Sequence, residues 1–157
     1  MTDPAREQVL SLLRGGNAHV TFDQALKDFP AKLRGVKPSG AEHTAWELLE
    51  HMRIAQWDIL EFSQSSKHVS PEWPRGYWPK TERPPNGDAW KKSIASFKKD
   101  LKAVEKLIED PKIDLYAKIP HGTGQNIFRE ALLVADHNAY HLGQLVLLRR
   151  LLGAWPE

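Results

Sequence analysis

Apolar residues in this chain recur at intervals of three and four over most of its length, and strand-like alternation over four or more residues is hard to find. This spacing gathers apolar side chains on one stripe of a helix, so the sequence predicts an all-α fold. With 157 residues, the chain is long enough for one domain with its own core. We therefore expect a single helical domain over residues 1–157.

Helix start and stop signals divide the chain into four principal helices. Thr21 with Gln24, and Thr44 with Glu47, have the spacing of a capping box, in which two side chains satisfy free backbone N–H groups at a helix start. Glycines and prolines supply the breaks between helices. The expected ranges are residues 4–14 with a second piece from 21 to about 30, then 44–66, about 90–110 and about 124–152. Long connections on both sides of the third helix make the prediction a four-helix bundle with long crossover loops.

Charge and composition exclude several classes of function. The 22 Lys and Arg residues nearly balance 20 Asp and Glu residues and the lysines are spread out, so no basic patch indicates nucleic-acid binding. Cysteine is absent, which excludes disulfides, thiolate ligands and a cysteine nucleophile, and leaves His, Asp and Glu as metal ligands. The sequence shows no signal-peptide segment and no apolar run of about 18 residues, so we expect a cytoplasmic protein without membrane contact.

His137 and His141 lie one helical turn apart within residues 132–144, which otherwise resemble the buried stripe of a helix. An imidazole without a partner in an apolar core costs free energy, so two on one inward face indicate a shared partner. Side chains at i and i+4 can both reach one ion at about 2.0–2.1 Å from each nitrogen. The alternative is a pair of core histidines satisfied by hydrogen bonds.

A third histidine, His51, is expected on an inward stripe of the 44–66 helix, where a bundle can bring it opposite His137 and His141. Three imidazoles leave coordination positions open, which is the pattern of catalytic zinc sites. We therefore expect these three residues to hold a divalent metal ion. The alternative, in which all three are core or pocket histidines, stays open at this point.

Two motifs carry a resemblance to a known family. Thr44-Ala45-Trp46-Glu47-Leu48-Leu49-Glu50-His51, followed by His137-Asn138-Ala139-Tyr140-His141-Leu142-Gly143-Gln144, resembles the DinB-like superfamily of small helical metalloproteins. The resemblance implies a four-helix bundle with a divalent metal, commonly zinc or nickel, on His51, His137 and His141; the ligand set also suits iron. Members are assigned as metal-dependent hydrolases or as enzymes that transfer a low-molecular-weight thiol, and dimers are frequent among them.

These observations favour a metal-dependent enzyme that activates either water, as a hydrolase, or a low-molecular-weight thiol, as an S-transferase, against a small-molecule substrate. The sequence shows neither a phosphate-binding glycine loop nor a readable arrangement of serine, histidine and aspartate, so the metal must carry most of any chemistry. Between hydrolysis and thiol transfer the sequence does not choose. One alternative is a non-catalytic bundle that binds a metal or a small molecule. Another is a helical protein without metal.

Four further side chains are candidates for a catalytic role. Gln144 lies one turn beyond His141 and can orient a metal ligand or a bound water; the alternative is a polar residue that hydrogen-bonds to a neighbouring helix. Asp58 and Glu130 each lie about 10 Å along a helix from a histidine, so a structural salt bridge or hydrogen bond is favoured over a role as a base. His121 lies in a loop beside a glycine, where a contact with substrate is the functional alternative to a surface position.

Two apolar features have more than one interpretation. The 44–66 helix carries a second stripe, formed by Trp46, Leu49, Trp57 and Leu60, which is either buried in the chain or offered to a second subunit of a homodimer. Residues 67–87 hold five of the eleven prolines and three interleaved aromatic residues. These aromatic side chains either wall a pocket or pack over the bundle.

Overall fold

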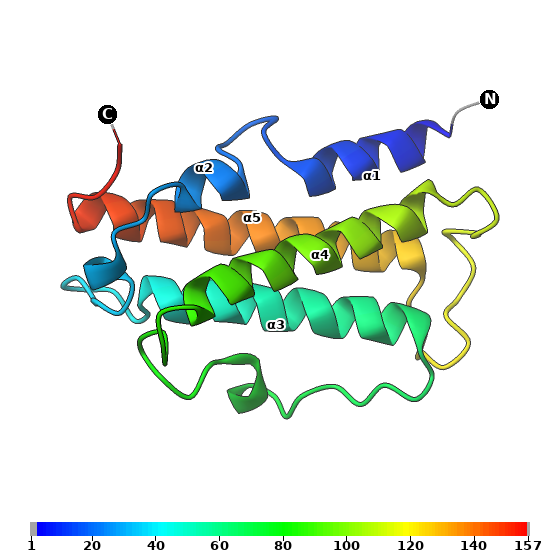
Figure 1. Cartoon of the computed structure of the whole chain (residues 1–157). Helices are drawn as coiled ribbons and strands as arrows, with labels where there is room; N and C mark the ends of the chain where they lie inside the picture. Colours follow the sequence, from blue (N-terminus) through cyan, green and yellow to red (C-terminus); the bar gives the residue numbers. More distant parts are fainter. Residues whose placement is uncertain (1–2, 157) are drawn as a thin grey trace.

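Helices form the regular structure of the computed structural model, which describes residues 3–156 (Figure 1). In that range the β-type pairing is limited to an isolated bridge between Lys118 and Asn126, so the all-α prediction is confirmed. Among the described residues, no helix has the length and apolar character that crossing a membrane requires. The helices are α1 (Pro4–Arg14), α2 (Phe22–Leu26), α3 (Ala45–Gln64), α4 (Ala89–Glu109) and α5 (Ile127–Leu151), with two short 3-10 turns, η1 (Ala31–Leu33) and η2 (Arg75–Tyr77).

The directions of the helices follow from the connections between them. The connection of residues 65–88 runs back along α3, so α4 starts near the start of α3 and both helices run in the same direction (Figure 1). After the connection of residues 110–126, α5 returns in the opposite direction and packs against both. α1 and α2 follow one another along α5, so the two pieces together take the place of the remaining helix of a four-helix bundle.

The first helix is interrupted, as its glycines predict, but its second piece is shorter than expected. α2 ends at Leu26 and does not continue to Pro30. The buried Arg149 side chain of α5 donates hydrogen bonds of 2.7 Å to the carbonyls of Ala25 and Lys27. Carbonyls at a helix end need partners from outside the helix. A contact from a distant part of the chain therefore supports this end of α2.

α3 buries two apolar faces inside the chain. Of the second stripe, Trp46, Leu49 and Leu60 are at most 5 % exposed, and Trp57 is partly buried. Trp46, Leu49 and Leu60 are covered within the bundle, where α3 packs against both α4 and α5. This stripe therefore needs no second subunit to cover it, and the homodimer stays a prediction without that support.

α5 begins slightly later than expected because its start is determined by side-chain and loop contacts. The side chain of Asn126 accepts a hydrogen bond from the backbone N–H of Arg129 and so caps the helix at Ile127. The carbonyl of Gln125 instead accepts from the N–H of Ile119 in the preceding loop, at 2.8 Å. Residues before Asn126 are thus held in the connection and not in the helix.

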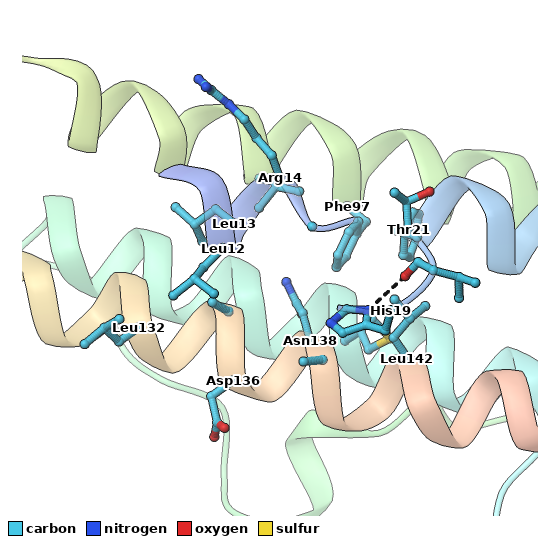
Figure 2. A pocket seen from close by; sticks show the side chains of 17 residues that line it. Leu12, Leu13, Arg14, His19, Thr21, Phe97, Leu132, Asp136, Asn138 and Leu142 are labelled. Atoms are coloured by element: carbon cyan, nitrogen blue, oxygen red, sulfur yellow. Dashed lines mark hydrogen bonds between the residues drawn. The ribbon is translucent and has the colours of Figure 1, made fainter. Parts of the chain in front are cut away.

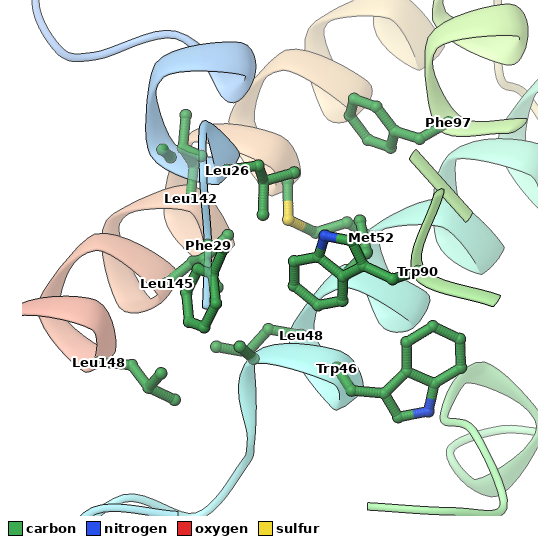
Figure 3. Close-up of a cluster of buried hydrophobic side chains, with 13 residues drawn as sticks. Leu26, Phe29, Trp46, Leu48, Met52, Trp90, Phe97, Leu142, Leu145 and Leu148 are labelled. Carbon is green, nitrogen blue, oxygen red and sulfur yellow. The ribbon is translucent and has the colours of Figure 1, made fainter. Parts of the chain in front are cut away.

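Two clusters of buried hydrophobic residues fill the bundle. The first lies where α2, the starts of α3 and α4, and the end of α5 meet, and Phe97 is among its members (Figure 3). It also contains Met52 and Leu142, which directly follow His51 and His141 in the chain. The second cluster is formed by α1, the ends of α3 and α4, and the start of α5. The first cluster therefore holds α3 and α5 together at the level of the histidines.

Candidate metal centre

His51 of α3 faces His137 and His141 of α5 across the bundle. The Nε2 atom of His51 lies 3.1 Å from Nε2 of His137 and 3.1 Å from Nε2 of His141. One ligand nitrogen from each of the three residues lies within 4.8 Å of the other two. Two nitrogens that are each about 2.0–2.1 Å from one tetrahedral zinc ion lie about 3.3 Å apart. The three histidines thus form a cluster that can hold a metal ion.

Hydrogen bonds on the outer side of two rings determine where their protons lie. Nδ1 of His51 lies 2.9 Å from the Tyr77 carbonyl, which can only accept, so Nδ1 carries the proton. Nδ1 of His141 donates in the same way to Oε1 of Gln144 at 2.7 Å. In the neutral rings, both Nε2 atoms therefore present lone pairs, which cannot hydrogen-bond to each other across 3.1 Å. A cation between the two atoms converts this unfavourable contact into a favourable one.

The surroundings keep the cluster in the neutral form. Burial lowers the pKa of His137 to about 3, and the neighbouring His141 and His51 add to the shift. Burial also lowers the pKa of His51 and that of His141, although the hydrogen bonds to Tyr77 and Gln144 act in the opposite direction. All three imidazoles are therefore neutral near pH 7, which is the state in which histidine binds metal.

An aromatic stack holds the ring of His51. Trp78 stacks on it with ring centroids 4.0 Å apart and an interplanar angle of 3°. His43 stacks on Trp78 in turn, at 3.9 Å and 21°. Helical spacing could not predict that His43 lies near the cluster, because this residue precedes α3 and is not on the same helix face as His51. Trp78 belongs to the aromatic residues of the 67–87 connection that the sequence singled out, and its stacking on His51 explains its presence there.

Comparison with known families agrees with this geometry. A family model described as the DinB superfamily matches residues 17–145. The chain belongs to the DinB superfamily. The match covers all three histidines of the cluster and begins after the end of α1. Comparison of this DinB superfamily chain with the curated proteins and with the solved structures yields no match.

Of the four further candidates in this DinB superfamily protein, two connect to the cluster. Gln144 does so directly, through its hydrogen bond to His141. Asp58 is buried and has no hydrogen bond to the three clustered histidines; its two carboxylate oxygens accept from the Tyr77 hydroxyl at 2.6 Å and from Nε2 of His68 at 2.7 Å. Asp58 is thus hydrogen-bonded as the structural alternative predicted, and it reaches His51 only through Tyr77.

The structure does not bring the other two candidates to the cluster. Glu130 is buried near the start of α5 and pairs with Arg129. His121 is exposed, and its Nε2 donates to the carbonyl of Phe62 at 2.7 Å. Phe62 lies about three helical turns beyond His51 on α3, roughly 16 Å along the axis. Both side chains therefore belong to the end of the bundle away from the histidines.

Two cavities differ in their relation to the cluster. One of about 350 Å³ is lined by Gln144 and His43, together with leucines that include Leu48 and Leu148. A second, of about 410 Å³, lies beneath the break between α1 and α2, where His19 is part of the lining (Figure 2). Neither lining contains His51, His137 or His141, but the first includes Gln144, which hydrogen-bonds to His141, and His43, which stacks on Trp78. The first cavity is therefore the one that shares residues with the surroundings of the site.

Proposed function

We propose that this chain is a metal-dependent enzyme that holds a divalent ion on His51, His137 and His141 and activates water or a low-molecular-weight thiol against a small-molecule substrate. The single observation that carries the proposal is the pair of Nε2 lone pairs of His51 and His141, which face each other at 3.1 Å. Membership of the DinB superfamily and the three-histidine cluster support the same conclusion.

The protein's own groups hold the ligands in the orientation that the chemistry needs. The Tyr77 carbonyl and the Gln144 amide oxygen each accept a hydrogen bond from the Nδ1–H group of one histidine, so that the Nε2 lone pairs of His51 and His141 point inward. Three protein ligands leave a coordination position for a further molecule. A divalent ion bound there supplies Lewis acidity, which lowers the pKa of a water or thiol at that position. An all-imidazole ligand set suits zinc, nickel or iron.

The cavity that Gln144 and His43 help to line suits a small molecule with an apolar part and a hydrogen-bonding group. Because Oε1 of Gln144 accepts from His141, the N–H groups of the same amide are left for another acceptor, such as a carbonyl. Leucine side chains, among them Leu48 and Leu148, supply apolar walls. A volume of about 350 Å³ is in the range of small-molecule sites.

Elemental analysis tests the metal site. Wild-type protein purified without chelator should contain about one divalent ion per chain, and His51→Ala, His137→Ala and His141→Ala should each lose most of it. His121→Ala serves as a matched control, because its side chain is exposed at the other end of the bundle. Unchanged metal content in all three cluster variants would exclude this site.

An assay panel tests the reaction. Metal-loaded protein is incubated with esters, amides and electrophilic thiol acceptors, each with and without an added low-molecular-weight thiol. Turnover that needs the thiol supports S-transfer and excludes simple hydrolysis, whereas thiol-independent turnover of esters or amides supports hydrolysis. A protein that retains its ion without turnover of any of them would favour the non-catalytic binding bundle.

A further inference from the structure

We propose that Asp58 is a positioning residue for the metal centre: it anchors Tyr77, and Tyr77 in turn sets the orientation of His51. This inference rests on the proposed metal site, but it concerns residues outside the ligand set. It also gives a role to the connection of residues 65–88, which neither the fold nor the three histidines explain.

Asp58 joins two points of that connection to α3. One carboxylate oxygen, Oδ2, accepts from the Tyr77 hydroxyl at 2.6 Å, and the other, Oδ1, accepts from Nε2 of His68 at 2.7 Å. The side chains of Asp58 and His68 are only 11 % and 8 % exposed. A short hydrogen bond from a hydroxyl to a buried carboxylate is among the stronger kinds, because the acceptor is charged and water cannot replace the donor.

Tyr77 bridges Asp58 and His51 with its two ends. Its hydroxyl donates to Asp58, and its backbone carbonyl accepts a hydrogen bond of 2.9 Å from Nδ1 of His51. Asp58 and His51 lie about two turns apart on α3, roughly 10 Å along the axis. Burial and the nearby Asp58 carboxylate raise the pKa of Tyr77 to about 12, so its hydroxyl stays protonated as a donor at physiological pH.

The residue after Tyr77 reinforces the same arrangement. Trp78 stacks on the His51 ring almost in parallel, so the position of this loop segment determines both the plane of the ring and the acceptor for its Nδ1 proton. If the hydroxyl anchor is lost, the carbonyl and the indole are both free to shift relative to α3. The Nε2 lone pair of His51 then points toward His137 and His141 in a smaller fraction of the molecules.

Both oxygens of Asp58 are occupied by donors from the loop, so this carboxylate is engaged as an anchor and is not free to act as a base. Outer groups that orient metal-binding histidines typically contribute about 10- to 100-fold to metal affinity. Asp58 acts on His51 indirectly, through its hydrogen bond to Tyr77, whereas the Tyr77 carbonyl contacts His51 itself. We therefore expect an effect at the lower end of that range, about 10-fold.

Cobalt binding to the full chain tests the inference. The dissociation constant of Co²⁺ and its visible absorption spectrum are measured for wild type, Tyr77→Phe and the control Tyr116→Phe, together with the thermal stability of each metal-free protein. Tyr116 is an exposed tyrosine of the 110–126 connection, beside Phe128. Tyr77→Phe should weaken Co²⁺ binding about 10-fold and alter the visible spectrum, and Tyr116→Phe should do neither.

A second pair of variants makes the test independent of one substitution. Asp58→Asn keeps an acceptor for the Tyr77 hydroxyl and should weaken binding less than Asp58→Ala does. Wild-type affinity and spectrum in Tyr77→Phe would overturn the inference, even if its metal-free form were less stable, because that pattern describes a purely structural contact. Failure of the wild type itself to bind Co²⁺ would instead overturn the proposed metal site.

Discussion

Replacing His137 by Gln should reduce the amount by which the free energy of unfolding of the metal-free protein falls as the pH is lowered. The His137 side chain is partly buried beside His51 and His141, and burial lowers its pKa from the ordinary 6.5 to about 3. Gln has a similar polar character but does not titrate. The comparison therefore isolates the proton that the unfolded chain binds and the folded chain does not.

The sign and size follow from that difference. Above pH 6.5 neither state of the chain binds the proton, so the full stability is present. Between pH 6.5 and about 3 the unfolded state binds it and the folded state does not, so stability falls as the pH falls. The slope approaches about 1.4 kcal/mol per pH unit once the unfolded side chain is fully protonated; because it is only half protonated at pH 6.5, the fall from pH 6.5 to 4.5 costs about 2.3 kcal/mol. The lowered pKa values of His51 and His141 add to this fall in the wild type.

Urea unfolding followed by tryptophan fluorescence provides the measurement. Wild type and His137→Gln are unfolded at pH 6.5, 5.5 and 4.5 with a chelator present, because bound metal would add its own dependence on pH. His19→Gln is the matched control, since His19 is exposed and lies outside the cluster. The reasoning is refuted if His137→Gln loses as much stability as the wild type over this range.

Two further substitutions test single contacts. Gln144→Ala removes the acceptor for the Nδ1–H group of His141 and should weaken Co²⁺ binding about 10- to 100-fold in a spectroscopic titration. Gln144→Glu keeps an acceptor and should bind Co²⁺ nearly as the wild type does. Equal weakening in both variants would contradict this role of Gln144. Arg149→Met leaves three backbone carbonyls without their donor and should lower the free energy of unfolding, measured in urea, by roughly 3 kcal/mol. The control Arg150→Met replaces an exposed neighbour and should change this free energy by less than about 1 kcal/mol. A stability of Arg149→Met equal to that of Arg150→Met would show that these bonds contribute nothing.

The two helix starts with a capping box were predictable. The capping boxes at Thr21 and Thr44 form as their spacing indicates, because each needs only residues three positions apart. The predicted end of α2 was wrong, because Arg149, from the far end of the chain, donates to the carbonyls of Ala25 and Lys27 at the end of this helix. The interpretation of the second α3 stripe as a possible subunit surface also depended on which neighbours cover Trp46 and Leu49, and those neighbours lie elsewhere in the sequence.

The sequence by itself determined that the chain is helical and that His137 and His141 share one face, because the period of a helix relates side chains along one element without reference to any other. It also marked His51, through a motif and an inward stripe. Only the tertiary structure decided that Trp78 stacks on His51 and that Tyr77 spans from His51 to Asp58. These contacts depend on the path by which residues 65–88 return along α3, and no helical period describes the path of a loop.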